Sequence, residues 1–222
     1  MGTWLFEEEP EHGLFGPPPQ PWTPGECIVH RPDGALVDDA ALGELRRAGE
    51  LGFEVIEADA PWPEKGGGGR GANTKYAVLE EHEIIEAMLR SPVWAPTPNA
   101  HLYLWVTNNH LESGMHVMRA LGFRYVTNLV WTKNRAGIGQ YFRGRHELVL
   151  FGVRSKGRGY EHRSDERGLD TLVGGRVTIH SAKPDEFYEK AERRSTGRRL
   201  SMFSRAPREG WWTWGNEVIA RP

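Results

Sequence analysis

The sequence predicts a single α/β domain with a largely parallel sheet and helices on both of its faces. Short apolar runs rich in β-branched and aromatic residues alternate with segments whose apolar residues recur at helical spacing. Glycines close several of the helical segments and lead into the next apolar run. The chain has 222 residues, 38% of them hydrophobic, which is enough for one domain with a sizeable core.

The first 50 residues are expected to form an irregular arm with one short helix. Proline, glycine and tryptophan are frequent up to residue 35, which favours a loop lying over the domain, with a disordered segment as the alternative. Asp38 can cap a helix over residues 39–48. We therefore expect an arm at 1–50 and the main domain at 51–222.

The remaining elements follow from the same patterns. The expected strands span residues 53–58, 101–107, 123–132, 147–153, 199–204 and 217–219. The expected helices span residues 79–90, 110–121 and 184–194, the last with a proline at its start.

Composition argues against several classes of protein. The net charge of −2 provides no overall basic field for gripping a duplex, so nucleic-acid contacts have to come from local patches. The single cysteine, Cys27, rules out an internal disulfide and a multi-cysteine zinc site, and a reducing, cytoplasmic compartment is expected. No motif has metal-ligand spacing. No stretch approaches the roughly 18 consecutive apolar residues of a membrane span, and we expect no signal peptide.

The most informative motif is Asp59-Ala60-Pro61-Trp62, directly after the expected strand at 53–58. Open α/β sheets bind ligands beyond the carboxyl ends of their strands. A carboxylate and a backbone carbonyl at one point can accept both N–H bonds of an exocyclic amine, and an indole can stack on a flat heterocycle. An ordinary strand end followed by a proline turn is the alternative.

Further segments follow this motif in a fixed order. They are His101–Asn108, Leu121–Val126, Leu129–Lys133, Tyr141–Gly152, His180–Tyr188 and Trp214–Glu217. From about Phe53 to Val218 the ordered set resembles the MT-A-seventy family, which includes the catalytic subunit of the messenger-RNA adenosine methyltransferase and many prokaryotic DNA adenine methyltransferases. The resemblance implies a Rossmann-like, S-adenosylmethionine-dependent methyltransferase fold.

The resemblance also implies roles for the Asp59 motif in methyl transfer to the 6-amino group of adenine. Asp59 and the carbonyl of Ala60 would accept the two amine hydrogen bonds, Pro61 would keep Ala60 extended, and Trp62 would stack on the base. The family usually has proline at position 60, so this chain lacks the locked backbone there.

The residues that match the family's cofactor positions are Asp59, Lys183, Arg205, Asn216 and Glu217. A lysine just before a helix start is poorly placed for the helix dipole, which favours a functional role for Lys183. A plain turn is the alternative for the Asn216-Glu217 pair. Ser201 is a second departure, because the family usually has glutamate at this position, where ribose is bound.

The expected substrate-binding residues are Tyr76, Trp131, Lys133, Arg143 and Arg145. Tyr76 follows four successive glycines that fit a mobile surface loop or a lid, and a core tyrosine is equally compatible. Lys133 could meet a phosphate or the cofactor carboxylate, or lie at a solvated strand end. The basic residues from Arg143 to Arg163 fit nucleic-acid backbone contact or a solvated face. A second basic cluster, at 193–199, lies at a helix end.

We therefore predict a methyltransferase that acts on adenine N(6) in DNA, with RNA as an alternative substrate. DNA is preferred because the chain lacks the appended regulatory regions typical of the RNA enzymes, and a duplex target would require base flipping. A non-catalytic, methyltransferase-like subunit that binds nucleic acid is the other hypothesis, motivated by Ala60 and Ser201. The near-neutral charge favours a homodimer or a partner subunit that completes the binding surface, and we expect a prokaryotic or phage origin.

Overall fold

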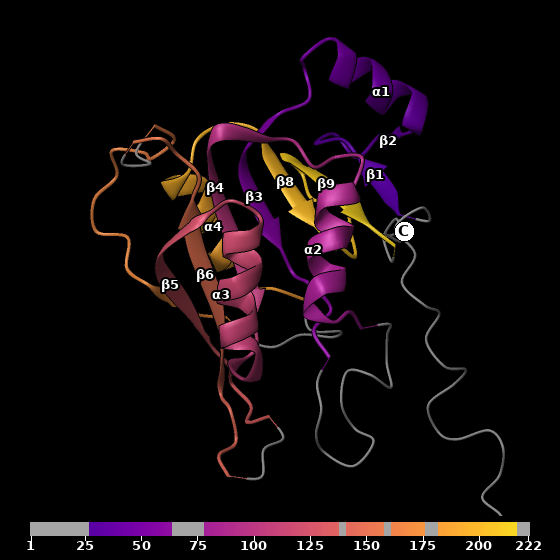
Figure 1. Cartoon of the computed structure of the whole chain (residues 1–222). Coiled ribbons are helices and arrows are strands. Elements are labelled where there is room, and N and C mark those ends of the chain that lie inside the picture. The colour runs from indigo at the N-terminus through magenta and orange to yellow at the C-terminus, as the bar shows by residue number, and fades with distance from the viewer. Residues whose placement is uncertain (1–26, 64–77, 138–140, 158–160, 176–181, 217–222) are drawn as a thin grey trace, which may run out of the picture.

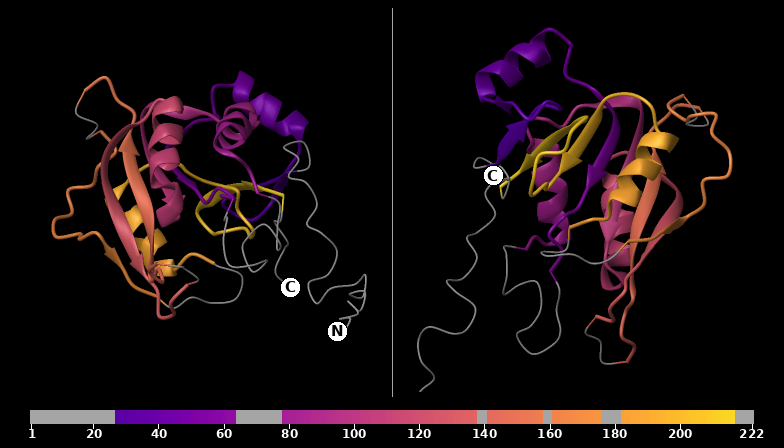
Figure 2. Two further views of the ribbon diagram at one scale, coloured as in Figure 1. Left: turned by 60° about the horizontal axis from the view of Figure 1, so that its bottom comes forward. Right: turned by 180° about the vertical axis from the view of Figure 1, so that it is seen from behind.

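The computed structural model describes residues 27–63, 78–137, 141–157, 161–175 and 182–216. One large sheet lies at its centre. Helices α2 (Glu81–Arg90) and α3 (Leu111–Ala120) cover one face of the sheet, and α4 (Asp185–Arg194) covers the opposite face (Figures 1 and 2). The predicted α/β fold with helices on both faces is confirmed.

Two smaller helical elements complete the described helices. Helix α1 (Asp39–Arg47) begins after Asp38, whose side chain accepts a hydrogen bond from the Ala41 amide at 2.8 Å, as predicted for its cap. A short 3-10 turn, η3 (Asn108–His110), precedes α3. The four α-helices begin and end within two residues of the predicted bounds.

The described strands are β1 (Ile28–His30), β2 (Leu36–Val37), β3 (Phe53–Ala58), β4 (Pro96–Val106), β5 (Arg124–Thr132), β6 (His146–Val153), β7 (Leu172–Val173), β8 (Arg199–Met202) and β9 (Trp211–Gly215). Their order in the sheet is β2-β1-β9-β8-β3-β4-β6-β5-β7. The pairs β3–β4, β3–β8, β8–β9 and β5–β7 are parallel, and the other four are antiparallel. The sheet is therefore mixed, because β6 follows β5 without an intervening helix and runs against both of its neighbours.

Both ends of the described chain differ from the sequence prediction. The region expected to be an irregular arm contributes β1 and β2, and β1 pairs with β9. The last described strand is β9, which the sequence analysis did not predict, whereas the strand expected at 217–219 lies outside the described residues. The domain boundary at residue 50 stays a prediction.

Strand β4 separates two apolar layers. Leu102, Leu104 and Val106 face the cluster that contains buried residues of α2 and α3. Tyr103 and Trp105 alternate with them and pack on the other face with buried residues of α4.

Two helical glycines give a matched test of this packing. A Cβ on Gly114 in α3 would lie 2.4 Å from Cγ1 of Val106, a short and stiff side chain. We expect Gly114→Ala to destabilise the fold by about 1–3 kcal/mol through overpacking. On Gly43 in α1 the nearest atom is the end of the flexible Arg47 side chain at 3.4 Å. Gly43→Ala should stabilise by roughly 0.5–1 kcal/mol. Urea unfolding of both variants checks the opposite signs, and equal effects would contradict the close approach of α3 to β4.

Candidate active site

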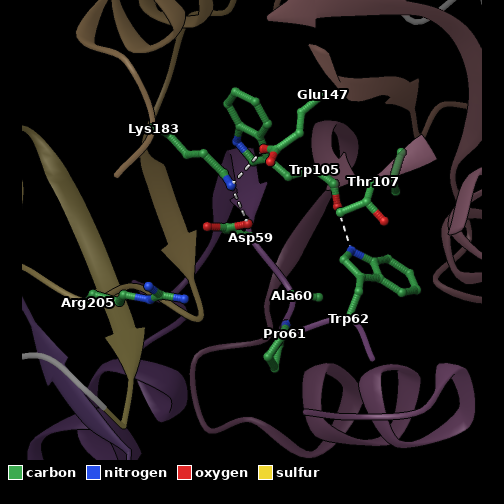
Figure 3. Close-up of a pocket in the computed structure, with 10 residues that line it drawn as sticks. Asp59, Ala60, Pro61, Trp62, Trp105, Thr107, Glu147, Lys183 and Arg205 are labelled. Carbon is green, nitrogen blue, oxygen red and sulfur yellow. Dashed lines mark hydrogen bonds and ion pairs between the residues drawn. The ribbon is translucent and has the colours of Figure 1, made fainter. Parts of the chain in front are cut away.

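Polar side chains meet at the edge of the sheet where β3, β4 and β5 end. Asp59 follows β3, Thr107 follows β4 and Lys133 follows β5. Glu147 joins them because β6 is antiparallel and therefore begins at this edge. The pocket at this edge is lined by Asp59, Ala60, Pro61, Trp62, Trp105, Val106, Thr107, Glu147, Lys183 and Arg205 (Figure 3).

Lys183 lies at the centre of this site. Its Nζ lies 2.9 Å from Oδ1 of Asp59 and 3.2 Å from Oε2 of Glu147. It also lies 4.8 Å from the centre of the Trp105 ring, a cation–π distance. Burial by itself would lower the pKa of Lys183, but the charges of Asp59 and Glu147 outweigh it and raise the pKa above the ordinary lysine value. Lys183 is therefore a buried, charged ammonium group.

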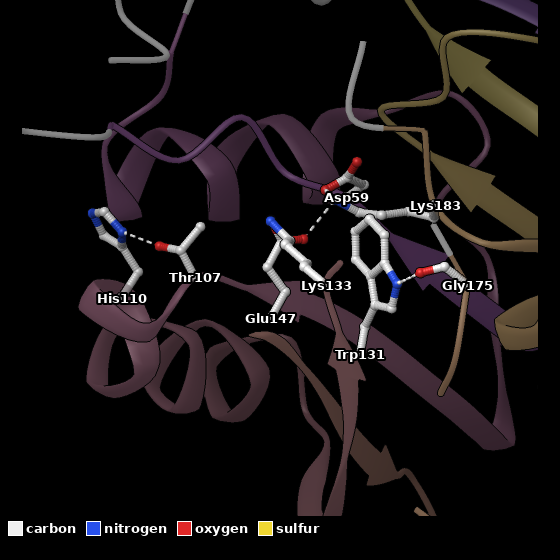
Figure 4. A network of polar contacts seen from close by, with 8 residues as sticks. All are labelled: Asp59, Thr107, His110, Trp131, Lys133, Glu147, Gly175 and Lys183. Carbon is white, nitrogen blue, oxygen red and sulfur yellow. Dashed lines mark hydrogen bonds and ion pairs between the residues drawn. The ribbon is translucent and has the colours of Figure 1, made fainter. Parts of the chain in front are cut away.

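Glu147 extends the network to Lys133, which pairs with its other oxygen (Figure 4). Burial opposes ionisation of Glu147, but Lys183 and Lys133 together hold its pKa below the usual range. Positive and negative groups thus alternate from Asp59 through Lys183 and Glu147 to Lys133. No local sequence pattern connects Glu147 to these two lysines, which are 14 and 36 residues away.

The backbone of the Asp59 motif is held in place on both sides. The Trp62 amide donates to the carbonyl of Ala60 at 2.9 Å, which forms a tight turn around Pro61. The Asp59 amide donates to the carbonyl of Met202 at the end of β8, at 3.3 Å. These bonds supply part of the rigidity that a proline at position 60 would give.

Trp62 forms a wall of the pocket. Its indole N–H donates to the carbonyl of Trp105 at 2.8 Å, and its ring stacks on His110 with 5.4 Å between ring centroids. Only 5% of Trp62 is exposed. Stacking of a base on Trp62 stays a prediction, and one face of the indole is already covered by His110.

Glu57 is a buried carboxyl group that sequence reasoning missed. It lies in β3 two residues before Asp59, and it is 1% exposed. Ser201 of β8 donates to its Oε2 at 2.6 Å. Burial, reinforced by the charge of Asp59, raises the pKa of Glu57 to about 8. A glutamate inside the apolar run 53–58 was the available sequence indication. The hydroxyl at the position where the family usually has glutamate therefore contacts a carboxyl group from the neighbouring strand.

Trp131 and Arg205 have different positions relative to the pocket. Trp131 is fully buried, donates its indole N–H to the carbonyl of Gly175 at 3.1 Å and packs edge-on to Trp105. Its burial makes it a packing residue behind the site rather than a direct substrate contact. Arg205 lines the pocket beyond the end of β8, beside the Asp59 motif (Figure 3).

Three of the predicted residues are described but do not line the pocket. Arg143 and Arg145 are exposed on the connection between β5 and β6, and Asn216 is exposed just after β9. Tyr76 and Glu217 lie outside the described residues.

The second basic cluster has structural contacts. Arg193 pairs with Glu166, and Arg194 donates to the carbonyls of Ser164 and Glu166. Both arginines therefore fasten the loop before β7 to the end of α4.

The raised pKa of Glu57 predicts a defined pH dependence of stability. The folded state keeps a proton that the unfolded state loses above its ordinary glutamate pKa of 4.5, so folding stability should fall as pH rises from 4.5 to about 8. Glu57→Gln removes this titration. The free energy of unfolding of the variant, relative to that of the wild type, should therefore rise across this pH window by on the order of a few kcal/mol.

Thermal unfolding at pH 5 and pH 8 measures this difference. Glu81→Gln is the control, because hydrogen bonds from Ser113 and His116 outweigh burial and lower the pKa of Glu81, so this variant should gain nothing at high pH. A difference between Glu57→Gln and the wild type that is independent of pH would show that Glu57 is ionised throughout.

Comparison with known proteins adds independent evidence. The catalytic subunit METTL3 of the N(6)-adenosine-methyltransferase of Homo sapiens is 29% identical over 178 residues, which cover 75% of this chain and 28% of METTL3. The N(6)-adenosine-methyltransferase MT-A70-like protein of Drosophila melanogaster is 28% identical over 209 residues, covering 86% of this chain and 31% of the relative. The N6-methyladenosine RNA methyltransferase MTA1 of Cryphonectria parasitica is 28% identical over 183 residues, covering 75% and 52%. The chain thus spans only part of the length of each of these relatives.

Two further findings bear on the class of protein. Among the described helices, none combines the length and the apolar character that crossing a bilayer requires. The family model described as MT-A70 matches residues 53–217, which include the Asp59 motif, Lys183 and Arg205. This match confirms the resemblance predicted from the sequence, and the chain belongs to the MT-A70 family.

Proposed function

We propose that the protein transfers a methyl group from S-adenosylmethionine to the 6-amino group of adenine in RNA. The membership in the MT-A70 family supports methyl transfer to adenine. RNA replaces the DNA substrate expected from the sequence, because the relatives carry the name N(6)-adenosine-methyltransferase and one is named as an RNA methyltransferase. The human relative is named as a catalytic subunit, which supports the expectation of a partner.

The pocket offers groups that fit this methyl donor. Lys183 and Arg205 are cationic side chains suited to its carboxylate and hydroxyl groups, and Asp59 is a carboxylate suited to its positive charge. Asn216 and Glu217 are proposed to complete the cofactor site. When bound, the donor supplies an electrophilic methyl carbon, whose bond to sulfur breaks with the electron pair going to sulfur.

Asp59 and Ala60 would orient the adenine amine. Oδ1 of Asp59 is paired with Lys183, and among the described residues no ion pair or hydrogen bond involves Oδ2. The carbonyl of Ala60 accepts the Trp62 amide and has a second lone pair. The amine nitrogen forms the new C–N bond with its lone pair and then loses one proton, so no covalent intermediate with the protein is needed.

The observation that carries this proposal is the fixed orientation of Asp59 beside an accepting backbone carbonyl. Lys183 holds one carboxylate oxygen, and the bond to Met202 holds the Asp59 backbone. Positioned acceptors of this kind act mainly where charge develops in the transition state, so they accelerate the reaction rather than only binding the substrate.

Methyl transfer to an RNA oligonucleotide tests the proposal. The wild type should methylate adenine in RNA, and Asp59→Asn should lower turnover by about 100-fold or more, the scale of losing one positioned polar group. Asp170→Asn is the matched control, because Asp170 is 70% exposed and pairs with Lys190 away from the pocket. DNA of the same sequence gives the substrate comparison. Near wild-type turnover of Asp59→Asn would refute the assignment, and preferential methylation of DNA would refute the choice of RNA.

The connection between β5 and β6 is proposed to contact the RNA backbone. Arg143 and Arg145 are exposed there beside Tyr141 and Phe142, which are 93% and 92% exposed. Basic side chains next to exposed aromatic rings suit single-stranded nucleic acid, because phosphates pair with the cations and bases stack on the rings.

Salt dependence of RNA binding tests this contact. Arg143→Gln combined with Arg145→Gln should weaken binding to all RNA sequences alike. The slope of log K against log salt concentration should become less steep by about one to two. The combination of Arg47→Gln and Arg90→Gln, at exposed positions of α1 and α2, makes the same charge change elsewhere and should leave the slope as it is. An unchanged slope in the first variant would show that the two arginines are solvated side chains that do not contact the RNA backbone.

A further inference from the structure

Glu57 is a buried ionisable group that the proposed reaction does not use. Its Oε2 accepts the hydrogen bond from Ser201, whereas its Oε1 has no hydrogen-bond partner in the described part of the chain. The indole N–H of Trp105 is close enough to favour the ionised form, yet it does not reach hydrogen-bonding geometry. This carboxyl group thus has a hydroxyl donor at one oxygen, while its other oxygen is unpaired among the described residues.

The charged side chains around Glu57 nearly balance one another when Glu57 itself is neutral. Asp59 lies two residues after Glu57, just beyond the end of β3, and its charge is balanced by Lys183. Glu147 is balanced by Lys133 on the far side of Lys183. An ionised Glu57 would therefore add one uncompensated negative charge to the network.

The elements packed behind Glu57 add little positive charge. Tyr188 of α4 interacts with Ser201, and burial together with the charges of Glu57 and Asp59 keeps its pKa well above the ordinary value. The Arg208 guanidinium lies 3.8 Å from the centre of the Tyr188 ring and pairs with Asp185. Arg208 is thus paired with another carboxylate, and a ligand that brings a positive charge into the pocket would favour an ionised Glu57.

We propose that Glu57 holds a proton until the cationic methyl donor enters the pocket, and that binding of this donor then releases the proton. The inference rests on the proposed function. A positive charge arriving near Asp59 favours the ionised form of Glu57, because the two attract each other in a weakly screened interior. The Ser201 hydroxyl is in place to stabilise the carboxylate that forms, and the Trp105 N–H lies near it.

The proton balance of the reaction is unchanged by this role. Methyl transfer leaves a neutral sulfur and moves the positive charge to the adenine amine, which loses one proton. Once that charge has left the site, Glu57 takes up a proton again. One proton per methyl group therefore still reaches solvent, but its release is divided between donor binding and turnover.

Isothermal titration calorimetry in buffers of different ionisation enthalpy tests this coupling. At pH 7.5 the wild type should release on the order of half a proton when it binds S-adenosylmethionine. It should release much less with S-adenosylhomocysteine, which lacks the positive sulfur. Glu57→Gln should remove the difference between the two ligands. The variant Glu81→Gln is the matched control, because Glu81 pairs with His116 of α3 away from the pocket and should behave as wild type.

A second variant keeps the test valid if Glu57→Gln does not fold. Ser201→Ala removes the hydrogen bond that favours ionisation of Glu57. Proton release should persist in this variant but shift to higher pH. Equal release by both ligands, undiminished release in a folded Glu57→Gln, or an unmoved pH range in Ser201→Ala would each overturn the role of Glu57 while leaving the proposed function intact. No binding of either ligand by the wild type would overturn the proposed function and this inference with it.

Discussion

The ammonium group of Lys183 is the contact on which the arrangement of the pocket depends. It joins the segment before α4 to the end of β3 through Asp59 and to the start of β6 through Glu147. Only 8% of its side chain is exposed, so loss of either carboxylate would leave a poorly compensated buried charge. Breaking such a buried pair typically costs about 3–5 kcal/mol. The same bridge orients Asp59, so the stability of the site and its proposed chemistry have one origin.

The polar residues of the site are arranged so that buried charges cancel. Two carboxylates alternate with two lysines across the edge of the sheet, while the third carboxyl group, Glu57, has a pKa raised to about 8. If Glu57 were ionised, the site would need a further cation to balance its charge. A protonated Glu57 leaves the buried charges balanced, and it can still ionise when a positive charge enters the pocket.

At the two positions that depart from the family pattern, the structure shows contacts that local sequence patterns do not predict. At position 60 the turn around Pro61 and the bond from Asp59 to Met202 hold the backbone that a proline would stiffen. At position 201 the serine contacts the Glu57 carboxyl group across a parallel strand pair. The sheet thus places side by side two residues that are 144 apart in the sequence.

The sequence by itself determined the α/β class, the bounds of the helices, the Asp38 cap and the position of Asp59 at a strand end, because these depend on local periodicity and backbone chemistry. Tertiary structure decided the mixed sheet, the pairing of β1 with β9, the burial of Trp131 and the roles of Glu57 and Glu147. The pairing, burial and contacts of these residues depend on which strand or helix lies beside them. Charge balance in particular depends on side chains that come together from the ends of β3 and β6 and from the segment before α4. No local pattern in the sequence predicts that these side chains lie close together.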